Sequence, residues 1–180
     1  PLGAFAARWE AFRAKDGPAD VAVIGGGVAG AELSMAMAHA LRARGREARV
    51  SLIDRGPVAR EFNDTARALL LDGLAENGVT AVEGTGVARV TDDAVVLEDG
   101  RKIASTFTTG VAGARPQGWL AKTGLDTHEG YLTVGPTLQS SDPNVFAVGD
   151  CAHLGWDPRP KAGVYAVREA PVLYDNLRAV

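Results

Sequence analysis

The chain has 180 residues, of which 46% are hydrophobic and 23% charged, and its formal net charge is −3. This composition is typical of a globular protein, and the acidic balance excludes a basic surface for nucleic acid. With a single cysteine, Cys151, and three scattered histidines, the sequence offers no set of metal ligands at the usual spacings. We therefore expect a small-molecule ligand, with no metal and no nucleic-acid partner.

Residues 1–18 are predicted to form a short helix followed by a linker. Phe5, Trp9 and Phe12 recur at spacings of four and three, which places them on one helix face. An aromatic stripe of this kind is usually buried surface, so we expect it to pack against the next element.

Residues 19–127 read as a dinucleotide-binding domain with a parallel sheet. A strand over 21–25 leads through a glycine-rich turn into a long alanine-rich helix, and a second strand, "RVSLID", ends at Asp54. A further helix follows with Asp64 as its expected N-cap and Gly78 as its end, and the third strand is "VTAVEG".

The stretch "GVARVTDDAVVLEDGRKIAST" breaks the alternation of strands and helices. It contains three short apolar runs joined by Asp92-Asp93 and by Asp99-Gly100, and Asp-Gly is a favoured hairpin turn. We therefore predict an antiparallel β-meander where a plain Rossmann fold has a crossover helix. The expected fold class is α/β, a Rossmann-like parallel sheet in a three-layer β/β/α arrangement.

Residues 128–180 form the last predicted segment. An apolar strand in "NVFAVGDC" is expected to stop at Gly149-Asp150. A helical pattern begins near Pro160, and Pro171 should kink or divide that helix.

The turn Gly25-Gly26-Gly27-Val28-Ala29-Gly30 matches G-x-G-x-x-G between a strand and a helix. In that context Gly25 permits the tight turn, Gly27 lets the backbone approach a pyrophosphate, and Gly30 allows close packing of helix on strand. The helix start, with Val28 and Ala29, supplies N–H donors for an anion. The alternative is a structural turn that binds no nucleotide.

Asp54 stands at the end of the second strand, where an acidic residue accepts hydrogen bonds from the adenosine ribose. Its charge repels a 2′-phosphate and favours NAD(H), although the neighbouring Arg55 could turn toward such a phosphate. The alternative for Asp54 is a solvated residue at a strand end.

The order of these motifs resembles the pyridine nucleotide-disulfide oxidoreductase superfamily, especially type II NADH dehydrogenases. The residues that carry the resemblance are "VIGGGVAGAE", "LID", the meander, "VAGARP" and "VFAVGDCA". The phrase "RPKAGVYAVREAP" is also similar to flavoproteins associated with selenide, water dikinases. In that superfamily an NAD(P)H domain is inserted into an FAD domain, so the resemblance implies that residues 128–180 belong to an incomplete FAD domain.

The resemblance also implies roles for single residues. Gly113, with Pro116, would shape the loop that closes the NAD domain, and Glu32 would face the nicotinamide side, although an acid in a first helical turn can also be simply exposed. Gly149 and Asp150 would contact the ribityl and phosphate region of FAD.

The helix that begins near Lys161 and Ala162 would point its N-terminus at the flavin pyrimidine. Lys161 could equally be a solvated helix start. No residue is expected to act as a general acid or nucleophile, because the cofactors carry the chemistry of hydride transfer.

We expect a C-terminal fragment of an FAD-dependent NAD(P)H oxidoreductase with an unknown acceptor, located in the cytoplasm or peripheral to the inner membrane. Its expected partners are the nicotinamide dinucleotide, a missing N-terminal segment of the FAD domain, and a second copy that covers the exposed half-site. The fragment alone is expected to be inactive and to lack FAD. Two alternatives stay open: a nucleotide-sensing module that binds NAD(H) without turnover, and a minimal flavoprotein in which Gly25–Gly30 itself holds FAD.

Overall fold

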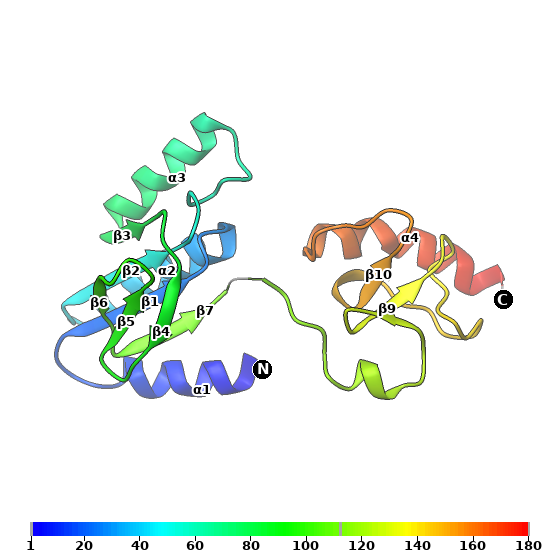
Figure 1. The fold of residues 1–180 in the computed structure, drawn as a ribbon, viewed down its shortest axis with the longest axis horizontal. Coiled ribbons are helices and arrows are strands. Elements are labelled where there is room, and N and C mark those ends of the chain that lie inside the picture. The colour runs from blue at the N-terminus through cyan, green and yellow to red at the C-terminus, as the bar shows by residue number, and fades with distance from the viewer. Residues whose placement is uncertain (1, 112, 180) are drawn as a thin grey trace. The chain divides into compact units, whose positions relative to one another are not determined.

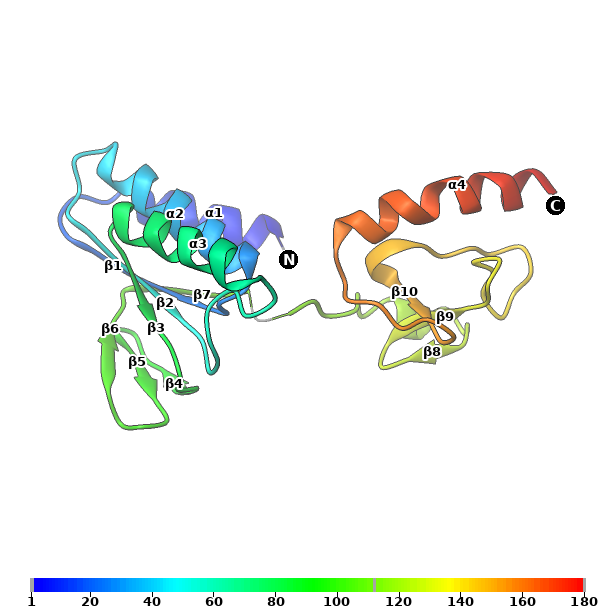
Figure 2. The same cartoon turned by 90° about the horizontal axis from the view of Figure 1, so that it is seen from above.

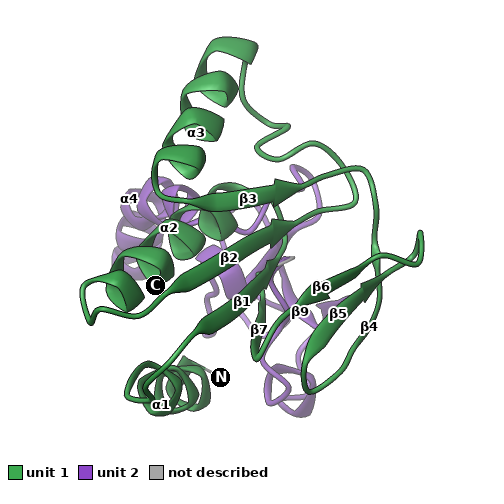
Figure 3. Ribbon diagram, turned by 90° about the vertical axis from the view of Figure 1, so that its left-hand side faces the viewer, with its two compact units in different colours: residues 1–112 green, residues 113–180 purple. Residues whose placement is uncertain are grey.

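The structure, a computed structural model, describes residues 2–111 and 113–179. The chain divides into two compact units, residues 1–112 and 113–180. Figure 1 shows the elements in chain order, and Figure 3 colours the two units separately. The predicted domain boundary between residues 127 and 128 lies inside the second unit, within the short strand formed by Thr127 and His128.

The first unit is built on a four-stranded parallel sheet of order β3-β2-β1-β7. Its elements are α1 (Leu2–Arg13), β1 (Ala19–Ile24), α2 (Val28–Arg42), β2 (Ala48–Ile53), α3 (Asp64–Glu76), β3 (Val79–Val82), β4 (Val87–Val90), β5 (Ala94–Leu97), β6 (Lys102–Ala104) and β7 (Phe107–Gly110). This is the parallel α/β fold that the glycine turn and the two apolar strands predicted.

Apolar side chains of this sheet pack on both of its faces, as is usual in parallel sheets. On one face, Val21 and Leu52 pack with Met37 and Leu41 of α2. On the other face, Ile53 packs with residues of the meander. Figure 2 shows the three layers, with the helices on one side of the sheet and β4, β5 and β6 on the other.

The meander β4-β5-β6 is antiparallel throughout, as predicted. Gly100 adopts a φ of +87° in the Asp99-Gly100 turn, a conformation that L-residues rarely adopt. The meander therefore forms the third layer of the unit and replaces a crossover helix between β3 and β7.

The aromatic stripe of α1 packs into the first unit, as expected. Phe12 is buried, and the rings of Phe5, Trp9 and Phe12 surround Phe107 of β7 with centroid distances between 5.0 and 6.3 Å. Arg46 joins α1 to the following loop because its guanidinium donates to the carbonyls of Phe12, Gly17 and Pro18.

The second unit contains a small three-stranded sheet of order β10-β9-β8 and one long helix. Its elements are η1 (Leu120–Lys122), β8 (Thr127–His128), β9 (Tyr131–Val134), η2 (Gly149–Cys151), β10 (Ala152–Leu154) and α4 (Gly163–Ala179). Leu120, Leu132, Val134 and Leu154 belong to its core, and Cys151 packs against it as a partly buried residue. Among the residues that the structure describes, no helix combines the length and apolar character needed to cross a bilayer.

Two local predictions were wrong, and a third was wrong in one of its two alternatives. The expected strand at 144–148 is reduced to a single bridge between Gln139 and Phe146, and the regular strand β10 begins after the Gly-Asp pair. The N-cap of α3 is Asn63, whose side chain accepts from the backbone N–H of Ala66, and Asp64 is the first helical residue. Of the two outcomes predicted at Pro171, a kink or a division of the helix, the division is wrong, because α4 is continuous from Gly163 to Ala179.

Candidate functional site

The glycine turn between β1 and α2 is held by close backbone packing. The N–H of Gly25 donates to the carbonyl of Ile53 at 2.8 Å, and Gly25 has a φ of +118°. A Cβ atom at Gly30 would lie 1.8 Å from the carbonyl oxygen of Gly25. The first and third motif glycines thus let the start of α2 approach the end of β1 closely.

The middle glycine of the motif has an open face. Gly27 is the N-cap of α2, and among residues 2–111 and 113–179 no side chain accepts a capping hydrogen bond at this end of the helix. Within 4 Å, a Cβ atom at Gly27 would meet only one atom of the described residues, Oε1 of Glu61 at 3.6 Å. Val28 and Ala29 form the first turn, and Glu32 is exposed on the same helix. Unpaired N–H groups and the helix dipole make such an end favourable for a phosphate group.

Asp54 binds the glycine turn directly. One carboxylate oxygen accepts from the backbone N–H of Gly26 at 2.6 Å, and the other accepts from the N–H of Gly56 at 2.7 Å. Asp54 therefore joins the turn after β1 to the loop after β2 (residues 55–62).

Gly26 is as constrained as the motif glycines, although the motif leaves its position free. A Cβ atom at Gly26 would lie 2.8 Å from Cβ of Asp54 and 3.0 Å from Cγ2 of Val58. The carbonyl of Gly26 also accepts from the N–H of Ala59 at 2.7 Å. Sequence reasoning missed this residue because its neighbours come from a loop about thirty positions later.

Arg55 extends away from the carboxylate of Asp54 toward the meander. Its guanidinium pairs with Glu98 Oε1 at 2.7 Å, and its side chain is largely exposed. Gly113, which was predicted to shape the loop that closes the dinucleotide-binding domain, is the first residue of the second unit and has a φ of +115°. The structure thus brings the glycine turn, Asp54 and Arg55 to one end of the sheet.

In the second unit, the Gly-Asp pair packs against α4. The N–H of Gly149 donates to Oε2 of the buried Glu169 at 2.6 Å. Gly149 has a φ of +64°, and a Cβ atom there would lie 2.9 Å from Cβ of Ala166. Only glycine meets both requirements without displacing the helix.

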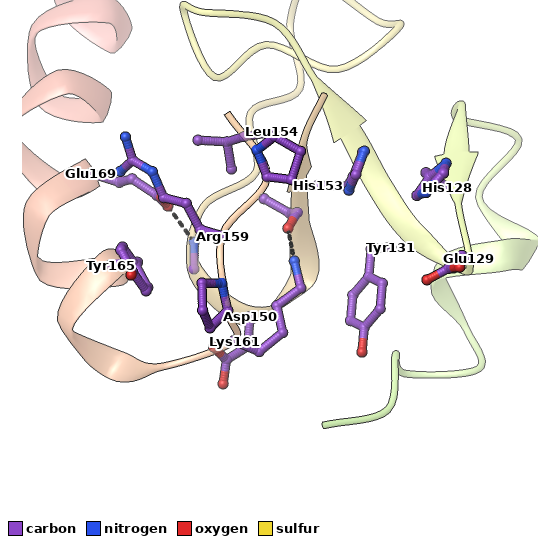
Figure 4. Close-up of a pocket in the computed structure, with 14 residues that line it drawn as sticks. His128, Glu129, Tyr131, Asp150, His153, Leu154, Arg159, Lys161, Tyr165 and Glu169 are labelled. Atoms are coloured by element: carbon purple, nitrogen blue, oxygen red, sulfur yellow. Dashed lines mark hydrogen bonds between the residues drawn. The ribbon is translucent and has the colours of Figure 1, made fainter. Parts of the chain in front are cut away.

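A pocket of about 280 Å³ lies between this turn, the small sheet and the segment before α4. Gly149, Asp150 and Lys161 all line it, and Asp150 is exposed. Figure 4 shows Lys161 reaching across the pocket, where it donates to the carbonyl of Ala152. Its ammonium also lies 4.3 Å from the ring centroid of Tyr131, so Lys161 is not simply solvated. Ala162 is exposed just before α4.

Two histidines stack at the edge of the same pocket. The rings of His128 and His153 have their centroids 4.1 Å apart with an interplanar angle of 23°. Burial lowers the pKa of His153, and the nearby positive charges of His128 and Lys161 lower it further. No sequence pattern indicated this pair, because His128 lies on β8 and His153 on β10.

Comparison with known proteins shows the family of the chain. The family model described as pyridine nucleotide-disulphide oxidoreductase matches residues 3–170. The chain belongs to this family. The match spans both the glycine turn and the Gly-Asp pair, so the sequence resemblance is confirmed at the level of the family.

Two relatives in this family illustrate the similarity. The chain is 36% identical over 137 residues to a nitric oxide reductase FlRd-NAD(+) reductase of Aeromonas hydrophila, covering 73% of the chain and 34% of that protein. It is 31% identical over 136 residues to monodehydroascorbate reductase 3 of Arabidopsis thaliana, covering 72% of the chain and 30% of that protein. The chain therefore spans about a third of the length of these relatives.

Solved structures of oxidoreductases have the same fold. The covalent complex of putidaredoxin reductase with putidaredoxin matches with a TM-score of 0.69 and 27% identity, over 90% of this chain and 41% of that one. The NADH-bound water-forming NADH oxidase of Lactobacillus brevis matches with a TM-score of 0.72 over 96% of this chain and 39% of that one. At 23% identity, the second comparison supports the fold alone.

Proposed function

We propose that the first unit binds NAD(H) and that the chain is part of an FAD-dependent NAD(P)H oxidoreductase. The observation that carries the proposal is the open N-terminus of α2 at Gly27, framed by the close-packed glycine turn and by Asp54. An anion such as a pyrophosphate suits this arrangement, because the helix end offers N–H donors and, among the described side chains, the exposed Glu61 is the one that reaches within 4 Å of a Cβ atom placed at Gly27.

Each residue of the turn has a distinct proposed task. Gly27, Val28 and Ala29 would bind the pyrophosphate through backbone N–H groups, while Gly25 and Gly30 keep the helix close to the sheet. Asp54 would bind the adenosine ribose and at the same time hold the turn through Gly26. NAD(H), when bound, supplies the hydride that such reductases transfer to flavin.

The charges around Asp54 favour NADH over NADPH. A 2′-phosphate at this strand end would meet the Asp54 carboxylate, and the guanidinium of Arg55 is already paired with Glu98. Glu32, exposed near the start of α2, is proposed to lie on the nicotinamide side. Gly113 is proposed to shape the loop that closes the NAD(H) domain.

The pocket of the second unit is proposed as half of an FAD site. Asp150 presents an exposed carboxylate to it, and Gly149 lets α4 approach the turn. Lys161 and Ala162, just before α4, would lie near the flavin pyrimidine. The proposed partner is the segment that completes the FAD domain, and the electron acceptor is a further partner. In its absence, a second copy of the chain would cover the half-site.

Calorimetric titration of the chain with NADH and NADPH tests the proposal. We expect NADH to bind more tightly, and equal or tighter NADPH binding would contradict the assignment of Asp54. We also expect the isolated chain to purify colourless and the longer protein to be yellow. Stoichiometric flavin absorbance in the isolated chain would instead favour a minimal flavoprotein, and NAD(H) binding without turnover in the longer protein would favour a sensing module.

A further inference from the structure

The backbone of Val58, in the loop after β2, is held on both sides by one ion pair. The N–H of Val58 donates to Oε1 of Glu83 at 2.6 Å, and its carbonyl accepts from Nε of Arg67 at 2.8 Å. Arg67 and Glu83 pair with each other through Nη2 and Oε1 at 2.6 Å. Glu83 directly follows β3 and Arg67 belongs to α3, so two neighbouring elements fix one residue of the loop.

The clamped residue is joined to the glycine turn by its neighbour. Ala59 is fully buried and adopts a φ of +53°, which a non-glycine residue rarely does. In that conformation its N–H donates to the carbonyl of Gly26 at 2.7 Å. The side chain of Val58 packs over Gly26 as well, since a Cβ atom at Gly26 would lie 3.0 Å from Cγ2 of Val58.

We propose that the Glu83–Arg67 pair is a positioning device for dinucleotide binding. The pair holds the backbone of Val58, and Val58 in turn keeps Ala59 in its left-handed conformation. The N–H of Ala59 then fixes the carbonyl of Gly26, while the N–H of Gly26 donates to Asp54. Glu83 and Arg67 act through the turn and not on the ligand. This inference rests on the proposed binding of NAD(H) at Gly27.

The exposure of the pair indicates positioning more than stability. The side chains of Arg67 and Glu83 are 29% and 34% exposed, so water can replace part of each hydrogen bond when one partner is removed. The loss should therefore appear in the order of the loop and in affinity, with a small effect on unfolding.

Substitutions at Glu83 test the proposal in the full chain. Glu83→Ala removes both interactions and should raise the Kd for NADH about tenfold, whereas Glu83→Gln keeps an acceptor for Val58 and should raise it about threefold. ADP-ribose, which contains the adenosine and pyrophosphate, should lose affinity by the same factors. Exchange of the Ala59 amide hydrogen, followed by NMR without ligand, should accelerate about tenfold in Glu83→Ala.

The ion pair between Asp20 and Arg49 offers a matched control. It joins the starts of β1 and β2, and Asp20→Asn should leave both the NADH Kd and the exchange of Ala59 unchanged. A folded Glu83→Ala variant with wild-type affinity would overturn the proposal. If the wild-type chain binds no NADH, the proposed function fails, and unchanged exchange at Ala59 in Glu83→Ala would overturn the clamp independently.

Discussion

Replacing Asp54 by alanine removes the acceptor of two backbone N–H groups, those of Gly26 and Gly56. Gly26 is buried, and an unpartnered buried donor costs about 1–3 kcal/mol. The N–H of Gly56 is partly exposed and can turn to water, so its loss should cost about 0.5–1 kcal/mol. We expect the free energy of unfolding of the first unit to fall by about 1.5–4 kcal/mol without any ligand.

Urea unfolding measured through the amide NMR signals of β1 and β2 reads the first unit separately from the second. Asp54→Asn retains one acceptor and should lose about 1–2 kcal/mol. Asp72→Ala, on the exposed side of α3, is the control and should stay within about 0.5 kcal/mol of wild type. A loss below about 0.5 kcal/mol in Asp54→Ala would show that the carboxylate does not hold the turn.

Three further predictions address both units. Gly27→Val should abolish NADH binding in calorimetry and leave the fold intact, because the side chain fills the open end of α2 but meets little protein. Arg46→Met should lower the free energy of unfolding by about 2–4 kcal/mol in the same urea assay, since three carbonyls around the end of α1 lose a nearly buried charged donor. Because the pKa of His153 is lowered in the folded chain, the unfolded chain takes up its proton first as the pH falls below about 6.5. Stability of the second unit should therefore decrease from that pH down toward the folded pKa and be flat above it, and His153→Gln should remove this slope.

Each of these expectations has a contrary outcome. Retained NADH affinity in a folded Gly27→Val variant would place the nucleotide elsewhere. An Arg46→Met variant as stable as wild type would mean that water replaces the guanidinium at the carbonyls. A slope in the pH profile that persists in His153→Gln would assign the titration to another group, with His128 as the first to examine.

Much of the fold followed from local patterns in the sequence. The glycine turn between an apolar strand and an alanine-rich helix required a parallel sheet, and the Asp99-Gly100 turn required a hairpin in the third layer. Both signals depend on backbone conformations that few residues adopt, so the turns can be predicted from the local sequence without knowledge of tertiary contacts.

The errors arose where two residues compete or where the partner is distant. Asn63 and Asp64 are both good N-caps, and only the backbone of the folded loop selects the first. The apolar run around Phe146 has strand composition, but in the described chain it makes one bridge, to Gln139. The roles of Asp54 and Glu83 toward the turn were invisible for the same reason, because hydrogen bonds to backbone atoms far along the chain leave no pattern in composition.

The contact of α1 with Phe107 has a consequence for the order in which the molecule is made. The first helix and the last strand of the unit meet in one aromatic cluster, and β7 pairs with β1 at one edge of the sheet. On the ribosome, β1 thus has an open edge and α1 an uncovered aromatic face until residues 107–110 emerge. Pairing of strands so far apart in the sequence is slow relative to local helix formation. The aromatic face of α1 and the free edge of β1 therefore stay open to aggregation until β7 is made.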